Sequence, residues 1–541
     1  MNTQLVLASL VAVHSSFLPI EPNSITPKHL TIKPNISTIN QRNDKSIFRV
    51  KEFVFQGNTV LSSEELQKVV AQFVGKELSF NDLLDAANTV TDYYVEKGYI
   101  NSGAYLPVVQ NQSVDPNSAV VTIAILEGRI EKVDIIGAGS LENYIRTRVP
   151  PENSVLNNNS LLAALQLLRL DPLVSKIRAT LTKGLSADKA ILIINVQPSQ
   201  DFKANVTLNN YRSPAIGSFE RRLQLSANNL LVSGDGLKVG YRNTDGSNAV
   251  TANYLIPVNS QNGTIAFNYL FSRSNIIEQP FTPLDIVGDA RVYEISFRQP
   301  LIRQATETSI QEFALGLTAS RIESETSLQN NPFPVGEGAD TSGRTRISAL
   351  RFSQDWSSRN TNQALFLSSK FSWGLDIFGA TINTNSPDGR FFTWVGQADW
   401  LRHWGETTLV VRTKVQLADR PLPILEQIST GGIGSVRGYR QDRFISDNAF
   451  SFSTELAIPV WKSQSQQLQV IPFFDIGTAW NNSEELSDTS GTLTSVGLGL
   501  QYRGDRFNAR LDWGIPLSDT TNNSNTWQEN GIYFSLDYQL F

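Results

Sequence analysis

The C-terminal part of the chain, from about residue 203 to residue 541, alternates apolar and polar side chains in many short segments. In GDGLKVGYRN, the residues Leu237, Val239 and Tyr241 share one side of an extended chain, and polar residues or glycine fill the other side. The segments GTIAFNYLFS and VYEISFRQ repeat this period of two. Such alternation is typical of a transmembrane β-barrel with a polar lumen. A soluble β-sandwich alternates as well, so the pattern alone does not say which face lies inside.

The length of this region predicts the number of strands. At about 21 residues per strand and loop, it accommodates an antiparallel transmembrane barrel of about 16 strands, an even number as such barrels require. Prolines recur in similar contexts at Pro257, Pro300, Pro459 and Pro516. Because proline cannot donate to a strand ladder, we expect each of them at a strand end or in a short turn.

The chain ends in YFSLDYQLF, a strand with a terminal aromatic residue. Bacterial outer-membrane barrels commonly end in such a strand, which the barrel assembly machinery recognises. We therefore take Tyr538 and Phe541 as a candidate assembly signal, although Phe541 is one residue out of phase with the alternation before it.

The N-terminal part has a different pattern, in which segments with the apolar periodicity of amphipathic helices alternate with short strands. After residue 47, a strand and a Gly-Asn turn precede a helix that Ser62 and Glu65 open as a capping box. A second helix opens at Ser79 and ends at Gly98, and two strands follow. Residues 47–129 therefore read as a β-α-α-β-β module.

The module is repeated at a constant offset of 80 residues. Four positions of the first strand and turn have counterparts in the second copy, which we place at residues 130–202: Val50, Phe53, Phe55 and Gly57 match Ile130, Val133, Ile135 and Gly137. A constant offset marks an internal repeat of one supersecondary unit. Two copies of a generic α+β scaffold are the alternative.

The N-terminus carries an apolar run from Leu5 to Val13, which has the length of a signal-peptide core and is too short to span a bilayer. We expect a signal peptide over residues 1–17 and a linker over residues 18–46; a misassigned start is the alternative. No run of 18 apolar residues occurs in the chain, which excludes a helical membrane protein.

Composition narrows the chemistry further. The 541 residues carry a net charge of −5 and include no cysteine and three scattered histidines, so thiolate sites are excluded and a His-based triad or zinc site is disfavoured. The acidic balance argues against a nucleic-acid partner, and no nucleotide-binding loop motif is present. We expect no enzymatic activity, no metal, no cofactor and no nucleotide.

Two motifs in the barrel-like region are the most specific in the chain. VRGY comprises Val436, Arg437, Gly438 and Tyr439, and FFDIGTAW contributes Phe473, Asp475 and Gly477. Together with the two modules, which resemble POTRA domains, they make the chain similar to the two-partner secretion transporters of the haemolysin secretion/activation family. The resemblance implies that VRGY lies at the tip of a loop folded into the lumen, where Arg437 pairs with Asp475 of the wall. An exposed arginine-rich loop is the alternative.

The resemblance also implies a function. An outer-membrane translocator would capture an unfolded partner polypeptide in the periplasm through the POTRA-like modules and export it through the barrel. The partner would be a large β-helical protein; outer-membrane lipid and the barrel assembly machinery are the other expected partners. The segment Gly103, Ala104, Tyr105 and Leu106 is our candidate partner-binding edge strand, since Pro107 disfavours a central position. An outer-membrane insertase of the same superfamily, a passive porin and a soluble β-rich glycosidase remain as alternatives.

Overall fold

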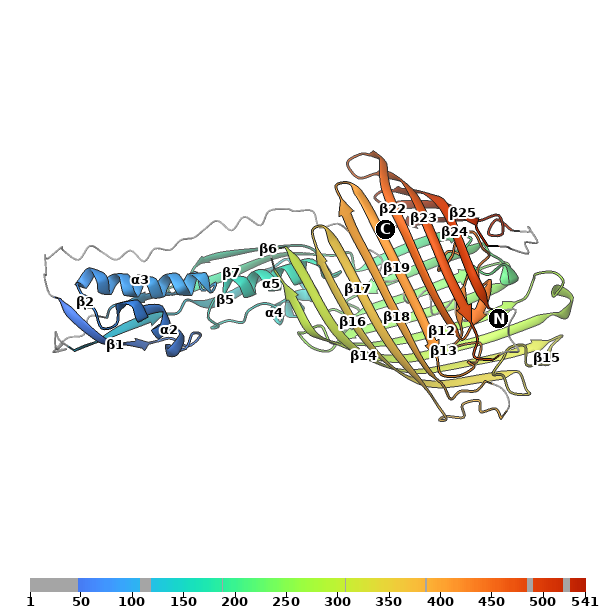
Figure 1. Cartoon of the computed structure of the whole chain (residues 1–541), viewed down its shortest axis with the longest axis horizontal. Helices are drawn as coiled ribbons and strands as arrows, with labels where there is room; N and C mark the ends of the chain where they lie inside the picture. Colours follow the sequence, from blue (N-terminus) through green and yellow to red (C-terminus); the bar gives the residue numbers. More distant parts are fainter. Residues whose placement is uncertain are drawn as a thin grey trace. The chain divides into compact units, whose positions relative to one another are not determined.

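The computed structural model describes residues 47–107, 118–186, 188–306, 308–384, 387–483, 490–518 and 526–541. The predicted signal peptide and linker lie outside these ranges. The chain divides near Ser199 and Gln200 into two compact units, drawn in blue to teal and in green to red in Figure 1. Among the described residues, no helix is long and apolar enough to cross a membrane.

The first module of the N-terminal unit is a four-stranded sheet packed against two helices. Its elements are β1 (Phe48–Gln56), α2 (Ser63–Val70), β2 (Glu77–Leu78), α3 (Phe80–Glu96), β3 (Gly103–Tyr105) and β4 (Ala119–Leu126), and the sheet order is β2-β1-β4-β3. Both predicted helix starts are confirmed, because Ser62 with Glu65 and Ser79 with Asp82 form capping boxes. The inner faces of α2, α3, β1 and β4 meet in one apolar core.

Among the described residues, the second module has the same order of elements without a counterpart of β2. It contains β5 (Arg129–Ile136), α4 (Glu142–Arg146), α5 (Asn158–Arg169), β6 (Val174–Lys183) and β7 (Lys189–Pro198), in the sheet order β5-β7-β6. In both modules the first strand pairs in parallel with the last, and both pairs carry a bulge near the start, after Val50 and after Ile130. The repeat therefore extends to the strand register.

The two glycines of the repeat have the same structural role. Gly57 and Gly137 both have positive φ, +88° and +81°, which favours glycine. A Cβ atom on Gly57 would lie against the carbonyl oxygen of Ile125, and one on Gly137 would lie 2.6 Å from that of Val196. Each glycine thus lets the turn after the first strand approach the last strand of its own module.

One asparagine joins the helices of the two modules. The side-chain oxygen of Asn157 accepts from the N–H of Ser160 at 3.1 Å and caps α5, and its amide group donates to the carbonyl of Lys97 at the end of α3, at 3.0 Å. The N–H of Asn158 donates to the carbonyl of Gly98 at 2.8 Å. The C-terminus of α3 and the N-terminus of α5 therefore satisfy each other's free backbone groups.

The second unit is a closed antiparallel barrel. Its strands are β8 (Phe202–Asn209), β9 (Glu220–Asn228), β10 (Gly236–Asn243), β11 (Ser247–Pro257), β12 (Thr264–Asn275), β13 (Ile286–Ala305), β14 (Ser309–Leu328), β16 (Arg344–Asn360), β17 (Gln363–Leu375), β18 (Phe392–Trp404), β19 (Thr407–Ala418), β22 (Asn448–Lys462), β23 (Gln467–Trp480), β24 (Gly491–Arg503), β25 (Phe507–Pro516) and β26 (Ile532–Gln539). The short β15 (Asn331–Pro332) pairs with the end of β14. Closure joins β26 to β8, and the prediction of about 16 strands is confirmed.

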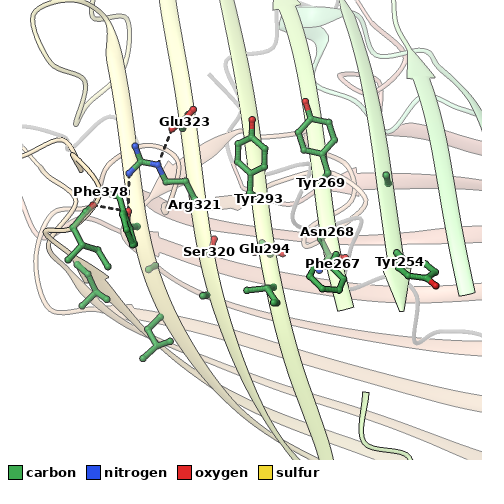
Figure 2. Close-up of a pocket in the computed structure, with 18 residues that line it drawn as sticks. Tyr254, Phe267, Asn268, Tyr269, Tyr293, Glu294, Ser320, Arg321, Glu323 and Phe378 are labelled. Carbon is green, nitrogen blue, oxygen red and sulfur yellow. Dashed lines mark hydrogen bonds and ion pairs between the residues drawn. The ribbon is translucent and has the colours of Figure 1, made fainter. Parts of the chain in front are cut away.

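The outer face of the wall is apolar and aromatic. On β10, Val239 and Tyr241 are exposed, whereas Arg242 on the opposite face is buried, as the alternation predicts. Figure 2 shows a hollow whose lining includes four aromatic residues of β11, β12 and β13: Tyr254, Phe267, Tyr269 and Tyr293. Residues that pair directly across strands share a face, so the face of Arg242 continues around the barrel as a polar interior.

The proline prediction is correct for two positions and wrong for two. Pro257 and Pro516 end β11 and β25, but Pro300 and Pro459 lie inside β13 and β22. Pro300 follows Arg298, the last residue of β13 that pairs with β12, so no β12 residue needs a hydrogen bond from it. Pro459 lies at a register shift between β22 and β23, where a missing donor is tolerated.

Candidate functional site

Residues 419–447 connect β19 to β22 and fold into the barrel. A short hairpin of β20 (Ile428–Thr430) and β21 (Phe444–Ser446) forms the base of this loop, and VRGY lies between the two strands. Val436 and Tyr439 are buried and pack against Ala449, Ala479 and other apolar residues of the hairpin and wall. We call residues 419–447 the lumen loop.

The structure brings Arg437 of the lumen loop and Asp475 of β23 together. The Arg437 Nε and Nη2 atoms donate to the two carboxylate oxygens of Asp475 at 2.7 and 2.8 Å, and the backbone N–H of Arg437 donates to the same carboxylate at 3.1 Å. Both side chains are at most 3% exposed. This is the planar two-bond geometry that guanidinium and carboxylate groups favour.

Two further carboxylates complete the surroundings of Arg437. Its Nη1 atom donates to Glu455 of β22 at 2.6 Å and to Asp512 of β25 at 3.3 Å. Arg510 bridges the same two carboxylates, with distances of 2.8 Å to Glu455 and 2.7 Å to Asp512. Burial alone would lower the pKa of Arg437, but the hydrogen bonds and charge of Asp475 and its neighbours raise it, so the loop tip stays cationic.

Phe473 and the glycines shape the space around this cluster. The Arg437 guanidinium carbon lies 3.5 Å from the centre of the Phe473 ring, a cation–π contact. Gly438 has φ of +94° and lies against the backbone of Gly514, and a Cβ atom on Gly514 would be 2.5 Å from the Gly438 nitrogen. A Cβ atom on Gly477 would lie 2.8 Å from a methyl group of Val436. The loop tip therefore approaches the wall closely at positions where glycine, which has no side chain, leaves room for it.

Tyr439 fixes the tip to β24 and β26. Its hydroxyl donates to the carbonyl of Thr494 at 2.8 Å and accepts from the N–H of Ser518 at 3.1 Å. Its own carbonyl accepts from the hydroxyl of Tyr533. All four predicted VRGY residues thus contact the wall.

Sequence reasoning missed several charged residues. Glu455, Asp512 and Arg510 belong to the cluster but have no motif of their own; their inward phase in the alternating strands was the available signal. Arg440, the residue after VRGY, donates to both carboxylate oxygens of Glu278 at 2.9 and 2.8 Å.

The two weaker candidate sites lie elsewhere. Gly103–Tyr105 forms β3, one of the two edge strands of the first sheet, and Leu106 packs against the module's core. The N–H of Ala104 donates to the Thr91 hydroxyl of α3 at 2.9 Å, so one backbone donor of β3 is already engaged. Tyr538 pairs with Val206 across the closure of the barrel, and the Phe541 ring stacks on Phe202 at 5.3 Å.

Comparison with known proteins identifies the family. The sequence model described as haemolysin secretion/activation protein ShlB/FhaC/HecB matches residues 188–502, which is more than half of the chain. A ShlB-type POTRA domain matches residues 48–128. The chain belongs to the haemolysin secretion/activation family. The resemblance drawn from the motifs is confirmed, and the protein is an outer-membrane β-barrel of this transporter family with periplasmic POTRA domains.

Individual relatives are distant but cover most of the chain. The outer membrane transporter CdiB of Dickeya dadantii (strain 3937) is 21% identical over 87% of this chain and 83% of its own length. The heme/hemopexin transporter protein HuxB of Haemophilus influenzae (strain 86-028NP) is 20% identical over 87% and 84%. The solved structure of CdiB from Escherichia coli superposes with a TM-score of 0.72 at 19% identity and covers 93% of both chains, which shows the shared fold.

Proposed function

We propose that this protein exports a partner polypeptide from the periplasm to the cell surface through its barrel. One observation carries the proposal: the barrel interior holds a loop fastened by Arg437 to a buried carboxylate cluster, as in a channel that is closed at rest and opens for a large substrate. CdiB and HuxB are both named as transporters, which supports this assignment.

Capture of the partner begins, in this proposal, at the first POTRA module. Tyr105 of β3, Leu126 of β4 and Val54 of β1 are exposed apolar residues, and Gly103 pairs with Leu126 while Tyr105 pairs with Ala124 at the edge of the sheet. An unfolded chain can add to such an edge by backbone pairing and cover the apolar residues beside it. The N–H of Ala104 already donates to the Thr91 hydroxyl, so an added strand either replaces this hydrogen bond or pairs with the other backbone groups of β3.

The partner then passes through the lumen after the VRGY tip leaves its site. Arg437, Asp475 and their neighbours act as the latch of the closed state in this scheme. No nucleotide is needed, because folding of a large β-helical partner outside the cell would give direction to the transport. Lipid surrounds the apolar outer face, and the barrel assembly machinery would insert the chain through its Tyr538–Phe541 end.

Deletion of residues 48–200 tests the proposal, with partner secretion and pore conductance measured separately. We expect secretion to fail while the barrel still folds and keeps the same ion conductance as the full-length protein. Normal secretion by the deletion variant would refute capture by the POTRA modules. Secretion that is intact while other outer-membrane proteins are depleted would point to the insertase alternative.

A point substitution tests the capture surface more narrowly. Tyr105→Ser should lower the secretion rate, because it removes the exposed ring beside the β3 edge. Val74→Ser is the control, since Val74 is an exposed apolar residue just before β2, the strand at the opposite edge of the sheet. Equal losses in the two variants would show that the edge is not the capture site.

A further inference from the structure

A second buried ion pair joins the lumen loop to the wall. Arg351 of β16 donates from Nη2 to Glu426 Oε1 at 2.7 Å and from Nη1 to Oε2 at 3.1 Å. The side chains are 9% and 7% exposed, and Ser372 of β17 accepts a third hydrogen bond from Arg351 at 3.0 Å. Glu426 precedes β20, ten residues or so before the VRGY tip.

The loop segment around Glu426 is seated in its own apolar pocket of the lumen. Leu422 and Leu425 are 0% and 3% exposed. They pack against inward-facing residues of four strands and one loop: Leu270, Val292, Ile322, Ile347, Ala349 and Phe391. The side chain of Asp447 accepts from the N–H of Leu422 at 2.8 Å and from the Gln427 amide at 3.2 Å, which fixes the backbone of the segment.

The two attachments lie on different parts of the barrel wall, and the cation and the carboxylate come from opposite partners in the two pairs. Four strands, β17, β18, β19 and β22, separate β16 from β23 in the barrel order. At the tip the loop supplies the cation and the wall supplies the carboxylates, whereas at Glu426 the loop supplies the carboxylate and the wall supplies the cation. The lumen loop is therefore fastened on two sides of the lumen.

We propose that Arg351 and Glu426 are positioning residues that hold segment 422–427 across the lumen independently of the VRGY tip. Release of Arg437 alone then leaves half of the lumen closed, and the full pore opens only when both attachments are broken. The proposal extends the transport function proposed above, since it assumes that the lumen is the path. A partner entering the lumen has two loop segments to displace.

The chain offers a clean reporter because it contains no native cysteine. Leu425→Cys places a thiol in the apolar pocket, where a membrane-impermeant maleimide should react slowly. Adding Glu426→Gln leaves Arg351 buried without its carboxylate, and we expect the labelling rate to rise by about 100-fold, as for other broken buried pairs. Asp419→Asn is the control, since its ion pair with Arg420 is partly exposed and asparagine keeps the acceptor for the N–H of Phe392.

Arg437→Gln separates the two attachments. In the Leu425→Cys background it should leave labelling nearly unchanged, and only Arg437→Gln combined with Glu426→Gln should produce the large, persistent ion conductance of an open pore. Arg351→Glu with Glu426→Arg should restore slow labelling, which a merely local packing defect would not allow. Heat-modifiable migration on a gel verifies that each variant is folded. If the variant with the Arg351 substitution does not fold, Glu426→Gln, which changes only the loop, still tests the proposal.

In the Leu425→Cys background, a labelling rate that Glu426→Gln leaves unchanged would overturn the proposal. So would an Arg437→Gln variant that is labelled as fast as Glu426→Gln, because the tip would then hold the whole loop. Rapid labelling of Leu425→Cys by itself would overturn it as well. Neither readout uses the partner polypeptide. If labelling and conductance follow the prediction while no partner is secreted, the proposed transport function fails and the second attachment stands.

Discussion

Replacing Arg437 by alanine should free the tip of the lumen loop. The change removes every side-chain hydrogen bond between the tip and Asp475, whose carboxylate is 1% exposed. Breaking a buried ion pair from one side costs about 3–5 kcal/mol, because the remaining charge stays buried and uncompensated. Arg510 still compensates Glu455 and Asp512, so we expect the lower end, about 3 kcal/mol.

Hydrogen exchange measures this opening directly. A loss of about 3 kcal/mol corresponds to an increase of about 100-fold in the fraction of time that the tip is open. Backbone amides of residues 434–441 should exchange faster by that factor, followed by mass spectrometry in detergent or lipid. Arg443→Ala is the control: the Arg443 guanidinium stacks on the Phe444 ring at 5.2 Å and has no ion pair among those found in the described residues.

The double variant decides whether the pair acts as a unit. Asp475→Ala should accelerate exchange about as much as Arg437→Ala, and the two together should add little, since either change removes the same interaction. Fully additive losses, or an Arg437→Ala variant with the same protection as Arg443→Ala, would show that the Arg437–Asp475 pair does not hold the tip.

Three further predictions concern the POTRA modules. Gly57→Ala should destabilise the first module by more than about 1 kcal/mol in denaturant unfolding, because the new methyl group clashes with Ile125 and alanine disfavours the positive φ. Gly75→Ala is the control and should cost less, because Gly75 also has a positive φ but has open space around it. Asn157→Ala should cost about 1 kcal/mol and speed amide exchange at the start of α5, and Asn158→Ala should not, because the backbone of Asn158 makes its bond. Hydrogen bonds from Ser62 lower the pKa of Glu65 from its usual 4.5, so the capping box stabilises α2 above that pH and this stabilisation is lost as the pH falls through the lowered pKa. Glu65→Gln should therefore remove this part of the acid sensitivity of unfolding. An unchanged pH profile of unfolding would show that the box contributes nothing.

Local patterns were enough to predict the architecture. Period-two alternation identified the barrel strands, and an 80-residue offset identified the repeated module, because both features follow from contacts within a strand or within one module. The capping residues Ser62 and Ser79 were visible for the same reason, since a cap acts on the backbone three residues later.

Partners across the lumen could not be predicted in this way. Glu455, Asp512 and Glu278 meet arginines of the loop through strand register and barrel closure, which bring together residues 18 to 162 positions apart. Only Asp475 was found, because it belongs to a motif known from the family. The misplaced Pro300 and Pro459 have the same origin: whether a strand tolerates proline depends on where its neighbour ends or bulges.

In the proposed transport mechanism, the partner polypeptide passes through the barrel interior. Site-specific photo-crosslinking from adjacent residues of β19 tests it, because Lys414 shares the inward face of Arg412, which contacts Glu455, while Val415 faces outward. A photoreactive residue at position 414 should crosslink the partner during secretion, and one at position 415 should not. Crosslinks from 415 alone, or from neither position while secretion proceeds, would contradict transport through the lumen.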